Sequence, residues 1–234
     1  MTSKKFQRLS VIIPVLNEEK NMESIQNLIE TIHSPNIPYE IIFVDGGSQD
    51  RTVDLLQSLP VTVIDSDKGR GIQLIAGVKA SNGDAYVFLH ADSKFDVSPL
   101  PQVVEGLKKS DLGCFRLKFD SPHFLLRLIA WGSNWRVRYR RIIFGDQGLF
   151  LSRDIYQKIG GFKPLPLMED YDFSRRAKAL NLRIYQSHQL IQSSSRYFQK
   201  VGILKSLCQM QYCQRLYRKG GSIKEIQEVY QHRR

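Results

Sequence analysis

Two aspartates stand at the ends of apolar runs that are typical of buried β-strands. Asp45 closes the run at residues 39–44, and Asp92 follows the run at residues 85–89. A carboxylate in such a place can accept hydrogen bonds from a nucleobase, or it can bind a hard cation such as Mg²⁺ or Mn²⁺. An ordinary strand-end turn is the simpler alternative for Asp45, since two glycines follow it.

A second acidic feature is the pair Glu169 and Asp170, which precedes a stretch with helical periodicity at residues 171–180. A carboxylate at this place can act as a general base that takes a proton from a hydroxyl group. The alternative is structural, because acidic side chains favour the first turn of a helix. No nucleophile–histidine arrangement and no metal-ligand spacing of the cysteines is present, so the sequence predicts neither a hydrolytic triad nor a zinc site.

The polar residues of the first half are expected to meet at one edge of a sheet. Apolar runs alternate there with amphipathic stretches, a pattern that favours βαβ units and parallel strands. In open parallel sheets, ligands bind beyond the carboxyl ends of the strands. Four groups would gather there, namely Asn17 with Glu18, Asp45, residues 67–70 and residues 90–92. Helix capping by the first group and a solvated loop at the third are the simpler alternatives.

The expected elements follow from hydrophobic periodicity. In the first half we predict strands at residues 10–15, 39–45, 61–64 and 85–89, and helices at 21–32, 52–59 and 71–80. In the second half we predict a strand at 111–119, an apolar-then-basic segment at 124–141, a strand–turn–strand at 142–151, and helices at 171–180 and 203–218. Neither GxGxxG after the first strand nor GxxxxGK[ST] occurs, which argues against a Rossmann dinucleotide site and a P-loop.

Several motifs occur in the order that is found in one known family. They are Val11-Ile12-Ile13-Pro14, Asn17-Glu18, residues 44–50 (VDGGSQD), Gly83-Asp84, residues 88–92 (FLHAD), Gly145-Asp146-Gln147-Gly148, Gly160-Gly161-Phe162 and Leu167-Met168-Glu169-Asp170. Over residues 9–200 the chain resembles the family 2 glycosyltransferases with the GT-A fold. His-Ala-Asp, Gly-Asp-Gln-Gly and Met-Glu-Asp together resemble the subgroup associated with arsenosugar biosynthesis gene clusters.

This resemblance implies an α/β protein with a mostly parallel mixed sheet, helices on both faces and a C-terminal helical tail. It implies an inverting glycosyltransferase, of hexosyltransferase type, that moves a sugar from a UDP- or GDP-linked donor to an unidentified acceptor hydroxyl. A non-catalytic module with the same fold, which binds a nucleotide or an anionic surface, is the alternative. We expect a single domain with a donor half at residues 9–120, an acceptor half at 121–200 and the tail at 201–234.

The resemblance also implies roles for individual residues. Asp45 would contact the nucleobase, and Asp170, with Glu169 beside it, would be the catalytic base. Asp92 would belong to the metal-binding motif, but His90 replaces the first acid of that motif. A neutral histidine can bind Mn²⁺ and suits Mg²⁺ poorly, so we expect Mn²⁺ or Mg²⁺ at Asp92, with His90 as a further candidate ligand. The full expected nucleotide-sugar set is Pro14, Asn17, Glu18, Asp45, Gly46, Gly47, Arg70, Ala91, Asp92 and Arg196. On the acceptor side the resemblance places Gly145, Asp146 and Gln147, for which a plain hairpin turn is the alternative.

The charge of the chain is unevenly distributed. There are 34 Lys+Arg and 23 Asp+Glu, a net charge of +11, but residues 1–120 carry a net −3 and residues 121–234 a net +14. No nucleic-acid-binding module accompanies this charge, so nucleic acid is not an expected partner. The basic half would instead attract a diphosphate donor, an anionic acceptor or an anionic membrane surface.

Two segments of the basic half have several interpretations. Four arginines at positions 136, 138, 140 and 141 follow an apolar, aromatic stretch, which suits an in-plane membrane segment, an anionic acceptor, or an amphipathic helix that packs on the sheet. The helix at 203–218 could contact a membrane or a second copy in a dimer, or dock onto its own domain.

The odd number of cysteines, three, points to a reducing compartment. No apolar run reaches the length of about 20 residues that spans a bilayer, so we expect no membrane-spanning segment. No signal-type apolar stretch follows the lysines near the N-terminus. We therefore expect a cytoplasmic protein, with peripheral attachment at the inner membrane surface as the alternative.

Overall fold

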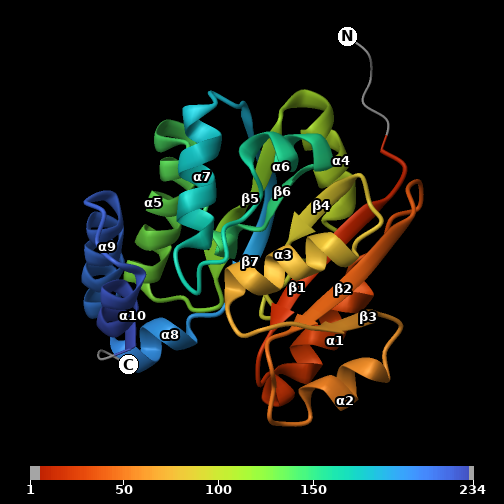
Figure 1. Ribbon diagram of the computed structural model, residues 1–234, viewed down its shortest axis with the longest axis horizontal. Coiled ribbons are helices and arrows are strands. Elements are labelled where there is room, and N and C mark those ends of the chain that lie inside the picture. The colour runs from red at the N-terminus through yellow and green to blue at the C-terminus, as the bar shows by residue number, and fades with distance from the viewer. Residues whose placement is uncertain (1–5, 232–234) are drawn as a thin grey trace.

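A seven-stranded mixed sheet forms the centre of the computed structural model, which describes residues 6–231 (Figure 1). The strands are β1 (Leu9–Val15), β2 (Tyr39–Asp45), β3 (Thr62–Asp65), β4 (Ala85–Phe88), β5 (Leu112–Phe119), β6 (Leu149–Ser152) and β7 (Ile184–Ser193). Their order is β3-β2-β1-β4-β6-β5-β7, and β6 runs antiparallel to both of its neighbours while the other pairs are parallel. The expected α/β architecture with a mostly parallel mixed sheet is confirmed.

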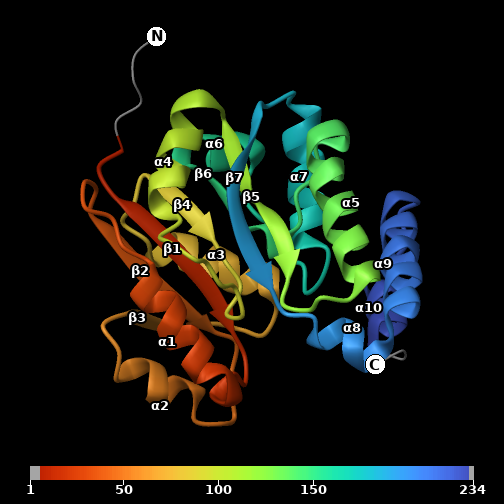
Figure 2. The same ribbon diagram turned by 180° about the vertical axis from the view of Figure 1, so that it is seen from behind.

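Helices cover both faces of this sheet. One face carries α1 (Met22–Thr31), α2 (Thr52–Gln57) and α4 (Leu100–Lys109), and the other carries α3 (Arg70–Ala80), α6 (Arg153–Ile159) and α7 (Glu169–Ala179) (Figures 1 and 2). Because side chains alternate along a strand, Val11 and Ile13 of β1 enter the first core and Ile12 enters the second. Burial on both faces explains why the central strands read as continuous apolar runs.

The remaining helices lie toward the β5–β7 end of the sheet. They are α5 (Phe124–Arg140), α8 (Arg196–Val201), α9 (Ile203–Arg218) and α10 (Ile223–Gln231). The tail docks onto its own domain, since the Tyr217 hydroxyl on α9 donates to Asp172 of α7 at 2.6 Å and the Tyr171 and Tyr217 rings are in contact. None of the helices in the described part of the chain is long and apolar enough to cross a membrane.

The strand–turn–strand expected at residues 142–151 is wrong in its first half. Residues 141–144 form a loop, Gly145–Gln147 form a 3₁₀ turn, and only β6 is a strand. The backbone of Ile143 finds a side-chain partner instead of a neighbouring strand, because its N–H donates to the Ser174 hydroxyl at 3.0 Å and its carbonyl accepts from that hydroxyl at 2.7 Å. A hairpin turn is therefore not the structure of the Gly-Asp-Gln-Gly segment.

The arginine cluster of α5 is also dispersed by the fold. Arg136 turns inward and places its guanidinium 4.0 Å from the Phe144 ring centroid. Arg141 ends the helix with a left-handed backbone, and its guanidinium donates to the Asn181 side chain and to the Leu182 carbonyl. The helix does pack on the sheet, as one interpretation expected, but its basic end is not uniformly solvated.

Candidate active site

The loops that follow β1 and β2 are fastened to each other at the edge of the sheet. The backbone of Asn17, which has a φ of 55°, donates to the Ser48 hydroxyl at 2.9 Å, and its side chain accepts from Gln49 N–H at 2.8 Å. Beneath them, the buried amide of Gln73 donates at 2.8 Å to one carbonyl at the end of each strand. In this structure Asn17 therefore joins the two loops, and its contact with a donor stays a prediction.

Asp45 is nearly fully buried within the turn that follows β2. One carboxylate oxygen accepts from the N–H groups of Gly47 at 2.9 Å and Ser48 at 2.8 Å, and the other accepts from the Ser48 hydroxyl at 2.5 Å. Gly47 has a φ of 88°, which favours glycine, while an added Cβ at Gly46 would come within 3.0 Å of Gln73. These residues hold the turn, as the simpler alternative expected, and a nucleobase contact by Asp45 stays a prediction.

Most of the residues that are predicted to bind the donor line one cleft beside this edge, and we call it the donor cleft after that prediction. The cleft has a volume of about 320 Å³, and its lining includes Pro14, Glu18, Arg70, His90, Ala91, Asp92 and Arg196. Two cations and two carboxylates therefore face a space large enough for part of a nucleotide. Burial, followed by the nearby Asp92 carboxylate, raises the pKa of Glu18, whereas the Asn21 amide and Arg196 oppose that shift.

A tight turn after β4 presents Asp92 to the cleft. The Ser93 N–H donates to the His90 carbonyl at 3.1 Å, and the Ser93 hydroxyl accepts from His90 N–H at 3.1 Å. Beyond the turn, Lys94 and Gln192 exchange two backbone hydrogen bonds of 2.9 Å, which tie this segment to β7. These hydrogen bonds fix the backbone on both sides of Asp92.

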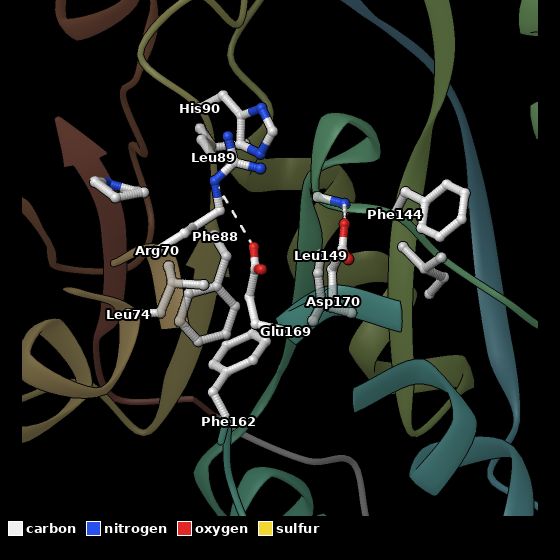
Figure 3. Close-up of a pocket in the computed structure, with 13 residues that line it drawn as sticks. Arg70, Leu74, Phe88, Leu89, His90, Phe144, Leu149, Phe162, Glu169 and Asp170 are labelled. Atoms are coloured by element: carbon white, nitrogen blue, oxygen red, sulfur yellow. Dashed lines mark hydrogen bonds and ion pairs between the residues drawn. The ribbon is translucent and has the colours of Figure 1, made fainter. Parts of the chain in front are cut away.

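Arg70 joins the donor cleft to the acidic pair at the start of α7. Its Nε lies 3.7 Å from Oε1 of Glu169, whose side chain is 3% exposed, while Arg70 itself is 44% exposed (Figure 3). Burial alone would lower the pKa of Arg70, but the carboxylates of Glu169 and Asp170 hold it above its ordinary value.

Gly71 lets the loop before α7 come close enough for this ion pair. Its N–H donates to the Leu165 carbonyl at 3.1 Å, and an added Cβ would lie 2.4 Å from the Lys163 carbonyl. Any larger residue would push the loop away, because backbone atoms cannot accommodate so short a contact.

Asp170 is held in a fixed orientation across the same pocket. Its Oδ2 accepts from Gly145 N–H at 2.7 Å, as the close-up shows, and its Oδ1 accepts from Tyr171 N–H at 2.6 Å (Figure 3). Gly145 is confined between two site residues, since an added Cβ would lie 2.7 Å from Nε2 of His90 and 3.4 Å from Asp170. Gly145, Glu169 and Asp170 line a pocket that shares Pro14, Arg70 and His90 with the donor cleft.

His90 is a neutral ring in this environment. Burial and then the Arg70 charge lower the pKa of His90 well below its ordinary value. Its Nε2 is buried without a hydrogen-bond partner. Within residues 6–231 no group of three or more His, Cys, Asp or Glu side chains could hold a metal ion, so any metal at Asp92 needs ligands from elsewhere.

The three residues expected on the acceptor side, Gly145, Asp146 and Gln147, have different surroundings. Gln147 is fully buried, and its Oε1 accepts from Arg136 at 3.3 Å, so it supports the 3₁₀ turn from behind. Burial, together with the nearby carboxylates of Asp170 and Asp92, raises the pKa of Asp146 to about 6, against the opposing charges of Arg136 and Arg70. Asp146 and Gly145 therefore belong to the electrostatic surroundings of Asp170, and direct contact of the three with an acceptor stays a prediction.

The raised pKa of Glu169 predicts a pH-dependent site. Burial and then the Asp170 charge raise the pKa of Glu169 to about 7, although Arg70 opposes them. Below that pH, Glu169 is protonated and its ion pair with Arg70 is lost. For the sugar transfer that the sequence resemblance implies, we expect kcat/KM to rise between about pH 6 and pH 8, because the paired form is the one that positions Arg70. A pH–rate profile measures this, and Glu169→Gln should remove the rising limb; an unchanged limb would contradict it.

The comparison with protein families identifies the chain. The model of "Glycosyl transferase family 2" matches residues 10–163, which is more than half of the sequence. The chain belongs to glycosyl transferase family 2. The matched region carries Asp45, Asp92 and Gly145, but it ends before Glu169 and Asp170.

Curated relatives of this family 2 chain include transferases of several names. A "Dolichol-phosphate mannosyltransferase" of Pyrococcus furiosus is 32% identical over 66% of the chain and 45% of that protein. An "Undecaprenyl-phosphate 4-deoxy-4-formamido-L-arabinose transferase" of Pseudomonas paraeruginosa is 31% identical over 42% of the chain and 31% of its own length. The chain thus spans less than half the length of these two relatives.

Solved structures show that this family 2 chain has the GT-A fold. "Mannosyltransferase PcManGT" from Pyrobaculum calidifontis, in complex with GDP-Man and Mn²⁺, matches with a TM-score of 0.66 and 17% identity over 82% of the chain and 57% of that protein. S. aureus TarS in complex with UDP matches with a TM-score of 0.63 and 19% identity over 80% of the chain and 60% of the matched chain. The expected GT-A architecture is confirmed, while the narrower arsenosugar-associated subgroup stays a prediction.

Three supporting residues of this family 2 site were not predicted from the sequence. Gln73 and Gly71 lie on α3, and Arg136 lies on α5 behind the 3₁₀ turn. The glycine at the first turn of a predicted helix was a usable signal, because glycine there suggests a close approach of backbone. Gln73 and Arg136 carried no such signal, since each acts on residues distant in sequence.

Proposed function

We propose that the protein is an inverting glycosyltransferase that uses a UDP- or GDP-linked sugar, with Asp170 as the catalytic base. The observation that carries the proposal is the fixed Asp170 carboxylate, which lines a pocket continuous with a cleft containing Arg70 and Arg196. Family membership and a structural neighbour that was solved in complex with GDP-Man and Mn²⁺ support it. The donor half at residues 9–120 and the acceptor half at residues 121–200 belong to this proposal.

The proposed reaction is a single displacement. Asp170 takes the proton of the acceptor hydroxyl while that oxygen attacks the anomeric carbon, and the bond from that carbon to the diphosphate oxygen breaks on the opposite face. Arg70 and Arg196 stabilise the negative charge that develops on the departing diphosphate. Glu169 holds Arg70 through the 3.7 Å ion pair and so acts as a positioning residue.

A divalent metal at Asp92 fits this arrangement. Mg²⁺ and similar ions at phosphate sites commonly use one or two protein carboxylates and take further ligands from the substrate phosphates. Asp92 is one of the two cleft carboxylates and suits that pattern, and a neutral His90 would favour Mn²⁺. When bound, the metal would neutralise charge on the departing diphosphate.

Thermal-shift measurements with UDP, GDP and their sugars, with and without Mn²⁺, test donor binding. Ligands that bind the folded state raise the unfolding midpoint according to their affinity, so one nucleotide series should stand out. Transfer to a panel of hydroxyl acceptors, with the anomeric configuration of the product determined, tests the inverting mechanism. Nucleotide binding without hydrolysis or transfer would instead favour the non-catalytic module, which the replacement of the first metal-motif acid by His90 already suggests.

We also propose a cytoplasmic location. Among the described cysteines, Cys114 and Cys208 are free thiols. Free thiols, one of them exposed, are typical of a reducing compartment.

A further inference from the structure

The outer face of α5 is an uninterrupted apolar stripe. Its five residues are between 44% and 71% exposed, although all are large apolar or aromatic side chains. They follow one another at intervals of four, three, four and four positions, which places them on one side of the helix. The stripe consists of Phe124, Leu128, Trp131, Trp135 and Tyr139. We call this face the α5 stripe.

The α5 stripe is not needed for packing within the domain. The helix is anchored through its opposite face, where Leu126, Ala130, Ser133 and Val137 are buried against the sheet. Figure 2 shows α5 beside β5, between the sheet and α9. Exposed apolar surface of this extent marks an interaction site, because isolated apolar side chains and not continuous rows are usual on a protein surface.

A basic groove adjoins the end of the α5 stripe. It has a volume of about 480 Å³ and is lined by Arg116, Arg138, Arg141, Arg183 and His188, together with neutral residues and no acidic one. Arg138 links the two features, since its guanidinium lies 5.8 Å from the Tyr139 ring centroid. Within the described residues, Arg183 pairs with Asp111, but neither Arg116 nor Arg138 has an acidic partner.

We propose that the α5 stripe and the basic groove form a docking surface for an anionic lipid bilayer. Trp and Tyr rings are suited to the boundary between headgroups and acyl chains, because each has an apolar body and a polar edge. The groove arginines would bind lipid phosphate groups at the same level. A second copy fits less well, since a symmetric pair would bring two groups of arginines together without acidic partners. This surface is independent of the donor cleft and does not rest on the proposed reaction.

Tryptophan fluorescence provides a direct probe of the proposed contact. The chain has two tryptophans, Trp131 and Trp135, and both belong to the α5 stripe. With vesicles of phosphatidylcholine mixed with phosphatidylglycerol, we expect the emission to shift to shorter wavelength and to be quenched by brominated acyl chains. With phosphatidylcholine alone, both effects should be much weaker. An emission that no vesicle changes would overturn the proposal.

Substitutions separate the two parts of the surface while keeping both tryptophans. The pair Phe124→Ser and Leu128→Ser should weaken vesicle binding by tenfold or more, on the order expected for losing two buried apolar side chains. Tyr39→Ser is the matched control, because Tyr39 is 36% exposed at the start of β2, which lies toward the other end of the sheet from β5. Arg116→Gln with Arg138→Gln should weaken binding by about fivefold for each charge, whereas Lys108→Gln should not.

Binding of a second copy of the chain to the α5 stripe, in place of a bilayer, would give a different result. Sedimentation velocity without lipid should show no dimer that depends on Phe124 and Leu128. A dimer that these substitutions dissociate, together with vesicle binding that they leave unchanged, would assign the α5 stripe to a second copy and overturn the bilayer proposal. Circular dichroism of each variant confirms that the helix remains folded.

Discussion

Asp170→Asn is expected to lower kcat for sugar transfer by about 10²–10⁴-fold, the usual contribution of a general base. The amide has nearly the same shape as the carboxylate, and its oxygen can still accept from Gly145 N–H, so the loop should keep its position. The amide nitrogen cannot accept from Tyr171 N–H, so that second hydrogen bond is lost. What the variant lacks is a group that accepts the hydroxyl proton during attack. Single-turnover kinetics would show slow chemistry, with the thermal shift by the preferred nucleotide unchanged.

Two further variants make this result specific. Asp154→Asn changes an exposed acid on α6 and should leave kcat unaltered. Glu169→Gln removes the partner of Arg70 and should therefore weaken donor use more than it slows proton transfer. If Asp170→Asn retained most of its activity while Glu169→Gln lost it, the base would be Glu169 and the proposed assignment would be wrong.

The strands of the donor half could be predicted almost to the residue because their sequences are unambiguous. The run at 39–45 became β2 with the same limits, since buried parallel strands leave no alternation that could suggest another element. Strand β7 was not predicted, because it lies at the edge of the sheet and its mixed polar and apolar residues resemble a loop. Helix α10 was missed as well, although it follows a glycine pair that ends α9.

The site residues at strand ends could be predicted from the sequence, because the fold brings strand ends together. The site residues that loops position could be predicted less well. Glu18, Arg70 and Asp92 share one cleft as parallel-strand geometry requires. The burial of Gln147 could not be predicted, because it depends on Arg136, a residue eleven positions earlier that turns inward and bonds it. The same inward turn removed Arg136 from the basic cluster, so composition alone overstated the charge on the surface of α5.

Asp92→Ala is expected to lower the transfer rate by about 10²–10³-fold, the effect of removing one electrostatic group that stabilises a developing charge. Asp92 is the carboxylate that the turn after β4 presents to the donor cleft, and Arg70 and Arg196 lie in the same lining. Without it, no carboxylate of that turn remains to hold a divalent ion beside the diphosphate. The extra thermal stabilisation that Mn²⁺ gives to the nucleotide complex should therefore disappear.

The matched control for this substitution lies in the same segment. Asp96 is an exposed acid that pairs with Lys118 at 3.3 Å, away from the cleft lining, so Asp96→Ala should keep both the rate and the Mn²⁺ effect. The decisive comparison is the Mn²⁺ titration of each variant, read both by transfer rate and by thermal shift with nucleotide. A full Mn²⁺ response in Asp92→Ala would show that the ion, if used, is held elsewhere. A lost rate with an unchanged Mn²⁺ response would assign Asp92 to the sugar or the ribose instead, because a carboxylate that binds hydroxyl groups needs no metal.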